Sequence, residues 1–186
     1  MIPLAFELRN RRVLVLGAGR VATGKTRLLL DSGAHVSVIA EHRLVEPPDG
    51  VVSFEERCYR PGDLDGFMLI VSATGDPATN DLVVAEARER GIWINVVDDP
   101  RRSDFFFTAV HRSGDVIVSV STQGASPALA QVVRDRIRDS LPPRLGEVAQ
   151  ALRDERRRLH ESGQSTEDVD WRELIAALWT RASRVA

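Results

Sequence analysis

Apolar and polar positions alternate in blocks along the first hundred residues, as they do where strands and helices follow one another. Predominantly apolar runs of strand length occur at residues 13–16, 35–40, 67–73 and 92–97. A shorter strand is expected at residues 51–55. Helical patterns follow the first of these runs and occupy residues 78–90, and each ends at a glycine, Gly33 or Gly91. Strands separated by helices predict a parallel sheet covered by helices, an α/β fold.

The pattern changes near residue 108. Residues 115–121 alternate apolar and polar positions, which predicts a strand with one covered face and one solvated face. Ser126 followed by Pro127 is typical of a helix N-cap and first helical position. This helix is expected to end before Leu141.

Two more helices are expected within residues 144–186, separated by a polar loop at residues 161–168. The charged run at residues 153–158 is interpreted as a solvated helix face. Apolar residues at helical spacing in the last helix are expected to serve core or subunit packing: Trp171, Leu174, Ile175, Leu178 and Trp179.

Two phosphate-binding patterns overlap after the first apolar run. Residues 17–22 fit the G-x-G-x-x-A turn of dinucleotide-binding domains, and residues 19–26 fit the G-x-x-x-x-G-K-T loop of P-loop hydrolases and kinases. In a P-loop, the chain from Gly19 to Gly24 would not be helical, and only about two helical turns would remain before Gly33.

Local pattern favours the dinucleotide turn. The apolar run stops at Gly17, and helical periodicity begins soon after it. The residues expected on one face of this helix are Val21, Ala22, Leu28 and Leu29. In this interpretation Gly17 and Gly19 shape the pyrophosphate turn, and the backbone N–H groups of Arg20 and Val21 meet phosphate at the helix start.

Other candidate cofactor contacts follow the neighbouring strands. Glu41 and His42 come directly after the second apolar run and are expected near the adenosine ribose, although an ordinary solvated loop is an equal alternative. Glu41 as an acceptor for the ribose hydroxyls would favour NAD over NADP. Thr74 and Asp98 follow two further strands, and side chains at the carboxyl ends of parallel strands line the ligand crevice.

Charge and composition narrow the function. The 186 residues predict one good-sized domain, or one domain with a smaller appendage, and the net charge of −2 gives no indication of nucleic-acid binding. The single cysteine, Cys58, excludes an internal disulfide and a zinc cluster, and no metal site is expected. No apolar run has the length of a membrane span and no signal-peptide pattern is seen, so a cytoplasmic protein without membrane contact is expected.

The order of these motifs resembles the precorrin-2 dehydrogenases of sirohaem synthesis, a module also found at the N-terminus of fused sirohaem synthases. The resemblance extends from Ile2 to about Leu145. It rests on the glycine turn with Lys25 and on four further motifs, at residues 28–30 (LLL), 72–77 (SATGDP), 95–98 (NVVD) and 121–130 (STQGASPALA). The chain departs from the family at Ala18, usually a glycine, and at Gln123, commonly a glycine.

The resemblance implies both an architecture and a reaction. Residues 1–107 would form an NAD-binding Rossmann domain, residues 108–140 a dimerisation segment and residues 141–186 a small helical domain, in a homodimer. The implied reaction is oxidation of precorrin-2 to sirohydrochlorin with NAD⁺. Some members of the family also insert Fe²⁺ as ferrochelatases, and this bifunctional alternative stays open.

Asp98 matches the family's catalytic aspartate. A carboxylate there would accept the proton released on oxidation or orient a pyrrole N–H, and the alternative is a turn-capping role before Asp99. Ser121, Thr122 and Ser126 are the candidate contacts for the substrate carboxylates, with helix capping as an equal alternative. Two other classes also remain open, a non-catalytic NAD(H)- or tetrapyrrole-binding protein and a P-loop nucleotide hydrolase.

Overall fold

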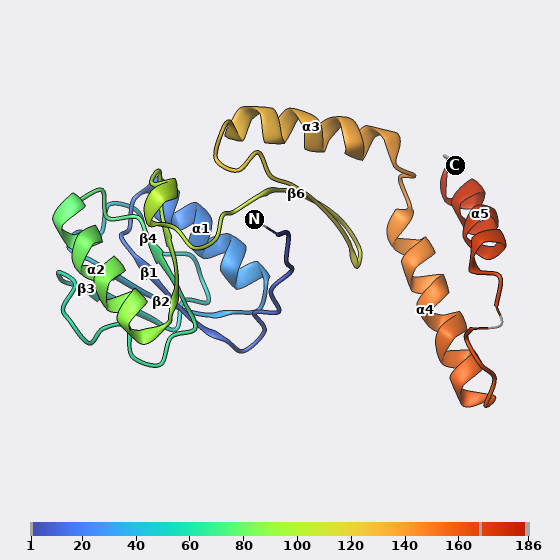
Figure 1. Ribbon diagram of the computed structural model, residues 1–186, viewed down its shortest axis with the longest axis horizontal. Helices are drawn as coiled ribbons and strands as arrows, with labels where there is room; N and C mark the ends of the chain where they lie inside the picture. The colour runs from blue at the N-terminus through green and yellow to red at the C-terminus, as the bar shows by residue number, and fades with distance from the viewer. Residues whose placement is uncertain (1, 168, 185–186) are drawn as a thin grey trace. The chain divides into compact units, whose positions relative to one another are not determined.

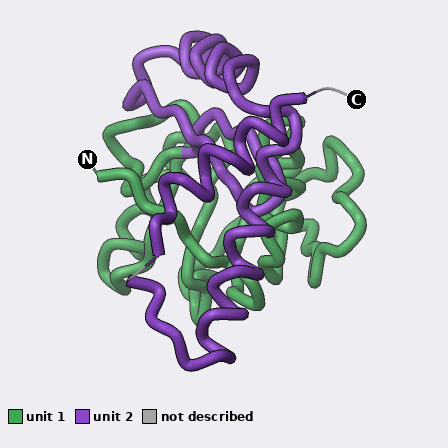
Figure 2. Tube along the Cα trace, turned by 90° about the vertical axis from the view of Figure 1, so that its right-hand side faces the viewer, with its two compact units in different colours: residues 1–106 green, residues 107–186 purple. Residues whose placement is uncertain are grey.

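The computed structural model describes residues 2–167 and 169–184. The chain divides into two compact units, residues 1–106 and 107–186 (Figure 2). Unit 1 contains a parallel sheet with helices, and unit 2 contains a hairpin and three helices (Figure 1). None of the helices in the described part of the chain is long and apolar enough to cross a membrane.

The sheet of unit 1 confirms the predicted Rossmann-type α/β fold. Its five parallel strands lie in the order β3-β2-β1-β4-β5. They are β1 (Arg12–Leu16), β2 (His35–Ala40), β3 (Ser53–Glu56), β4 (Leu69–Ser72) and β5 (Trp93–Val96). The order reverses between β1 and β4, where Val13 pairs with Leu69. This reversal is the place where open α/β sheets bind ligands.

The central strands are apolar at nearly every position because both faces of the sheet are covered. Residues 13–16 of β1 and all of β4 are buried. Helix α1 (Arg20–Asp31) packs on β1, β2 and β4, and helix α2 (Pro77–Arg90) packs on β4 and β5. Fully buried side chains such as Leu14, Ile70 and Ile94 each contribute about 1.5–3 kcal/mol through removal of apolar surface from water.

The buried face of α1 differs from the expected one. Val21 and Leu28 are 51% and 40% exposed, so placing them on a common face with the buried Ala22 and Leu29 was wrong. Two threonines complete the buried face instead, Thr23 and Thr26. Their hydroxyls donate to helix carbonyls one turn earlier, which satisfies them without water. A pattern based on apolar residues alone overlooks such threonines.

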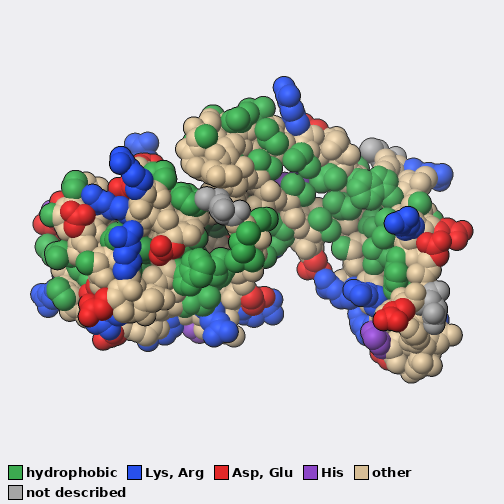
Figure 3. Space-filling model, in the orientation of Figure 1, with side chains coloured by type: hydrophobic (Ala, Val, Ile, Leu, Met, Phe, Trp, Pro, Cys, Tyr) green, Lys and Arg blue, Asp and Glu red, His purple; other side chains and the backbone are tan. Residues whose placement is uncertain are grey.

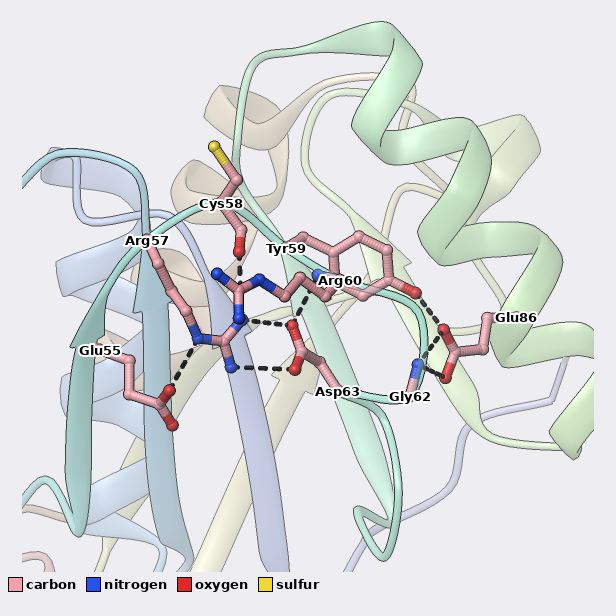
Figure 4. A network of polar contacts seen from close by, with 8 residues as sticks. All are labelled: Glu55, Arg57, Cys58, Tyr59, Arg60, Gly62, Asp63 and Glu86. Atoms are coloured by element: carbon pink, nitrogen blue, oxygen red, sulfur yellow. Dashed lines mark hydrogen bonds and ion pairs between the residues drawn. The ribbon is translucent and has the colours of Figure 1, made fainter.

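A polar network fastens the connection between β3 and β4 to α2 (Figure 4). The guanidinium of Arg57 donates to both carboxylate oxygens of Asp63, at 2.6 and 2.9 Å. The Glu86 carboxylate accepts the N–H of Gly62 at 3.0 Å and the hydroxyl of Tyr59. Burial, together with this carboxylate, raises the pKa of Tyr59 above its ordinary value. The network supplements the apolar anchor of this turn-rich segment, Leu64, which is fully buried in the core.

Unit 2 begins with an antiparallel hairpin, β6 (Ala109–Ser113) and β7 (Val116–Val120). Strand β6 was not predicted, because His111 and Arg112 interrupt its apolar alternation. Three helices follow, α3 (Pro127–Ser140), α4 (Leu145–Glu161) and α5 (Trp171–Ala182). Helix α3 packs on the hairpin, while α4 and α5 pack on each other. Their extents agree with the predicted helices.

Helices α4 and α5 share a small core of Leu145, Val148 and Ala182, with Leu178 packed against it. Of the α5 apolar stripe, Leu178 thus packs on this core, whereas Ile175 and Trp179 are exposed, and their predicted alternative, subunit packing, stays a prediction. The arginines of the charged run lie on the surface, as expected, and three of them, Arg153, Arg157 and Arg158, form ion pairs there. Such exposed pairs contribute little to stability.

We expect Gly17→Ala to lower the free energy of unfolding by about 2–4 kcal/mol, because Gly17 has a φ of +109° and a Cβ there would lie 2.5 Å from the Ala73 carbonyl oxygen. Urea unfolding followed by circular dichroism measures the loss. The matched control is Gly19→Ala, where no atom lies within 4 Å of the added Cβ and the expected loss is under about 1 kcal/mol. Equal losses for the two variants would contradict the steric argument.

Candidate functional site

The turn after β1 touches the turn after β4. Gly17 follows the last residue of β1, and its N–H donates to the Ile39 carbonyl at 2.8 Å. A side chain at Gly17 would overlap the backbone of Ala73 in the next turn. This close approach brings together the carboxyl ends of the strands on either side of the sheet's reversal.

Helix α1 presents an open N-terminus beside this contact. Gly19 is its N-cap, and no side chain caps the helix. The space where a Gly19 Cβ would project holds no atom within 4 Å. The N–H groups of the first turn, including those of Arg20 and Val21, lack intrahelical acceptors and lie at the positive end of the helix dipole. Such an end suits a phosphate group.

The helix start overturns the P-loop alternative. Helix α1 begins at Arg20, so Gly24 and Lys25 lie within the helix and not in or just after a loop. Thr26, the residue that would face Mg²⁺ in a P-loop, is buried, and its hydroxyl donates to the Ala22 carbonyl at 2.9 Å. The chain therefore uses the dinucleotide register of the two overlapping patterns.

Glu41 and His42 directly follow β2, which pairs with β1. Both side chains are exposed, and the His42 Nε2 lies 4.0 Å from the Glu41 Oε1. The pair thus sits at the carboxyl edge of the sheet, one strand away from Gly17. That position is compatible with the ribose contact predicted for Glu41.

Thr74 contributes to the turn between β4 and α2. Its hydroxyl donates to the Asn80 side-chain oxygen at 3.2 Å and accepts the N–H of Asp76 at the same distance. The Ser72 hydroxyl donates to the same Asn80 oxygen at 2.6 Å. The buried Asn80 accepts hydrogen bonds from both hydroxyls and was not predicted from the sequence. The sequence indicated only a polar residue in the first turn of α2.

Asp76 begins α2 as its N-cap. Its carboxylate accepts the N–H of Thr79 at 2.9 Å and the Thr79 hydroxyl at 2.6 Å. These hydrogen bonds lower the pKa of Asp76. The carboxylate therefore has a structural role.

Asp98 has an unusual backbone. It follows β5 with a φ of +62°, in the left-handed region that favours glycine, and its side chain is exposed. Aspartate tolerates this region better than most residues, but the conformation still costs about 1 kcal/mol or more. Its carboxylate forms no hydrogen bond, and no ion pair within 4 Å, with other described residues of unit 1. Strained residues of this kind cluster at functional sites.

The carboxylates that follow Asp98 in the sequence, those of Asp99 and Asp104, accept hydrogen bonds within the fold. Asp99 caps the short 3₁₀ helix η1 (Pro100–Arg102), accepts the N–H of Arg101 at 3.1 Å and pairs with Arg102 at 3.2 Å. Asp104 accepts the N–H of Ile94 at 3.1 Å. Both therefore serve the fold, as expected for Asp99. Among the described residues, no group of three or more His, Cys, Asp or Glu side chains has the arrangement of a metal site.

Three hydroxyl residues shape the loop before α3 in unit 2. The Ser126 hydroxyl accepts the N–H of Leu129 at 3.2 Å, which confirms the predicted N-cap. The Thr122 hydroxyl accepts the N–H of Ser126 and donates to its carbonyl, and the Ser121 hydroxyl accepts the N–H of Gln123. All three side chains are used within the loop, which presents the start of α3 to solvent.

Comparisons with known proteins match both units. A family described as putative NAD(P)-binding matches residues 4–109, and one described as sirohaem biosynthesis protein, central, matches residues 118–140. The first contains the glycine turn, Thr74 and Asp98. The second contains Ser121, Thr122 and Ser126.

Several similar proteins are named siroheme synthase. The one from Methylococcus capsulatus is 42% identical over 87% of this chain and 35% of its own length. Those from Azotobacter vinelandii and Tolumonas auensis are 40% and 39% identical, each over 80% of this chain and 33% or 32% of their own lengths. The chain thus spans about a third of the relatives that it matches.

The fold is similar to that of a solved structure named SirC, precorrin-2 dehydrogenase. The TM-score is 0.68 at 23% identity, and the match covers 97% of this chain and 88% of that one. At this identity, the likeness concerns the fold.

We predict that Gly19→Val weakens NADH binding by about tenfold or more, the equivalent of ~1.4 kcal/mol, because the side chain fills the open space at the start of α1. Fluorescence titration with NADH measures this. Gly24→Ala is the matched control, because it adds a Cβ in open space within the same helix. It should leave binding unchanged and stabilise the protein by about 0.5–1 kcal/mol. Binding lost in Gly24→Ala and kept in Gly19→Val would contradict the dinucleotide register.

Gln123 has a φ of +54° in the loop before α3, which explains why glycine suits this position. We expect Gln123→Gly to raise the free energy of unfolding by about 0.5–1 kcal/mol, since it relieves the left-handed strain. Gln123→Ala retains a Cβ and should give no such gain. Thermal unfolding compares the two, and equal stabilisation by both would show that strain is not the cause.

Proposed function

Because the chain belongs to the family of precorrin-2 dehydrogenases and sirohaem synthase modules, with a putative NAD(P)-binding domain at residues 4–109, we propose that it oxidises precorrin-2 to sirohydrochlorin with NAD⁺. The observation that carries the proposal is Asp98. Its carboxylate lies on a left-handed turn at the end of β5, at the sheet edge that also bears the glycine turn.

The residues at this edge fit a dinucleotide. Gly17 and Gly19 leave room for the pyrophosphate, and the first N–H groups of α1, at Arg20 and Val21, face outward from the helix start. Glu41 would accept hydrogen bonds from the adenosine ribose, with His42 beside it, which favours NAD over NADP. The bound cofactor supplies the hydride acceptor. Thr74 holds the adjoining turn in place through Asn80.

The reaction removes a hydride and a proton from precorrin-2. The hydride goes to NAD⁺, and the Asp98 carboxylate accepts the proton, so that sirohydrochlorin, NADH and one proton are formed. An exposed carboxylate without a structural hydrogen bond in unit 1 suits this role. The neighbouring Asp99 does not, because its carboxylate holds η1 and Arg102.

Precorrin-2 carries several carboxylates. The start of α3, with Ser126 as its cap and Ser121 and Thr122 in the preceding loop, is proposed to receive one of them. The helix dipole favours a negative group there. The hydroxyls hold the loop in the required shape.

A homodimer formed through residues 108–140 is part of the proposal. The hairpin of β6 and β7 contains no fully buried residue, and a hairpin of two strands alone is marginally stable in water. Exposed apolar side chains lie on this segment, at Ile117, Leu129 and Val132, which are 47%, 53% and 50% exposed. Hydrophobic side chains are visible on the surface of unit 2 in Figure 3. A second copy would cover such a surface.

A second candidate activity is insertion of Fe²⁺ into sirohydrochlorin. The names of the relatives, siroheme synthase, favour it, because sirohaem contains the inserted iron. The Asp98 carboxylate would then accept pyrrole protons as the metal enters. Fe²⁺ is a substrate in this reaction.

The test is anaerobic incubation with precorrin-2 and NAD⁺, with NADH and sirohydrochlorin followed together. We predict that Asp98→Asn lowers turnover by about 10²-fold or more while NADH binding is retained, because asparagine also tolerates a positive φ but accepts no proton. Addition of Fe²⁺ to the completed reaction tests chelation. Absence of turnover by the folded wild-type protein that still binds NAD⁺ would contradict the proposal and favour a binding or carrier protein.

A further inference from the structure

The segment after β2 carries an arginine whose side chain is held by the neighbouring strand. The Arg43 N–H donates to the Glu56 carboxylate at 3.3 Å. The Arg43 guanidinium donates to the Glu46 carboxylate at 3.3 Å and lies 4.0 Å from the Glu56 carboxylate. It also lies over the ring of Phe54, 4.4 Å from the ring centre. Phe54 and Glu56 belong to β3, which pairs with β2, so the sheet itself places these partners around Arg43.

The position of Arg43 gives these contacts a meaning for cofactor choice. Arg43 lies two residues after Glu41, the proposed partner of the adenosine ribose. In dinucleotide-binding folds an acidic residue at this place binds the 2′-hydroxyl of NAD, whereas a nearby arginine accommodates the 2′-phosphate of NADP. The segment after β2 contains both kinds of residue. The preference therefore depends on whether the Arg43 guanidinium is available to a phosphate.

The partners of Arg43 make it a poor phosphate ligand. Each contact is weak on its own, because the side chains are partly exposed to water. Together, however, the carboxylates of Glu46 and Glu56 offset the charge of the guanidinium. A 2′-phosphate that approached Arg43 would compete with these carboxylates and be repelled by them, since all three groups are negative. Such repulsion is one of the two ways in which a site discriminates between similar ligands.

A second arginine follows β3, but its side chain is directed elsewhere. The Arg57 guanidinium donates to both oxygens of the Asp63 carboxylate and to the Glu55 carboxylate, the latter at 2.8 Å (Figure 4). The other basic side chain of the segment after β2, His42, lies 4.0 Å from the Glu41 carboxylate. Arg43 is therefore the residue whose release would create a phosphate contact.

We propose that Glu46 and Glu56 are specificity-determining residues, which favour NAD over NADP because they hold the Arg43 guanidinium against Phe54 and oppose a 2′-phosphate beside it. Glu41 selects for the ribose hydroxyl in this account, and the other two glutamates select against the phosphate. The inference rests on the proposed function for the location of the cofactor site. It concerns binding alone and does not depend on the reaction.

Fluorescence titration of the intact chain with NADH and with NADPH tests the proposal without turnover. The wild type is expected to bind NADH about tenfold or more tightly than NADPH. In the double variant Glu46→Gln, Glu56→Gln, NADPH binding should strengthen by about tenfold, because the freed guanidinium meets a group that only NADPH carries. NADH binding should change by less than about threefold, since no contact with NADH is removed.

Two controls separate the release of Arg43 from a general change in charge. Glu56→Gln and Glu55→Gln each remove one negative charge at adjacent positions of β3, but the Glu55 carboxylate contacts Arg57 and not Arg43. The first should strengthen NADPH binding and the second should not. Addition of Arg43→Met to the double variant should abolish the gain. Circular dichroism checks that each variant is folded.

The outcomes distinguish this inference from the proposed reaction. An unchanged ratio of the two affinities in the double variant would overturn the inference, as would an equal gain in Glu55→Gln or a gain that persists with Arg43→Met. A wild type that binds neither cofactor would contradict the proposed function and the inference together. The predicted shift in affinities, without turnover of precorrin-2 by the wild type, would support the inference and contradict the dehydrogenase activity.

Discussion

The close approach of Gly17 to Ala73 is the constraint on which the candidate site depends. No side chain fits at Gly17, because its Cβ would lie 2.5 Å from the Ala73 carbonyl oxygen. This contact joins the turns after β1 and β4, where the strand order reverses. Helix α1 then starts at Arg20 with its N-terminus open, and the end of β5 lies along the same edge. The glycine turn at Gly17 and the candidate proton acceptor Asp98 are therefore both positioned by strands of the same sheet.

The candidate site combines several features that cost stability. Asp98 occupies a left-handed backbone conformation, and Lys25 keeps a partly buried ammonium group. Natural folds retain such costs mainly where function requires them. Gln123 in unit 2 carries similar backbone strain, and nothing in the structure explains why this chain has glutamine there. The strained aspartate and the partly buried lysine are thus more informative about function than the well-packed strands.

Sequence predicted much of this arrangement, because many of its signals are local. The apolar runs located the central strands, Gly17 marked the end of β1, and Ser126 marked the start of α3. Features that depend on distant residues were missed. Strand β6 needs its partner β7, and Asn80 needs the hydroxyls of Ser72 and Thr74.

The central claim is that the open start of α1 binds the pyrophosphate of a nicotinamide dinucleotide. The most direct measurement is backbone amide NMR of the intact chain during titration with NADH and, separately, with Mg-ATP. The account predicts that NADH shifts the amides of Arg20 and Val21 most strongly, together with those after β2 near Glu41. Shifts centred on Gly24 and Thr26 with Mg-ATP, and none at α1 with NADH, would contradict it.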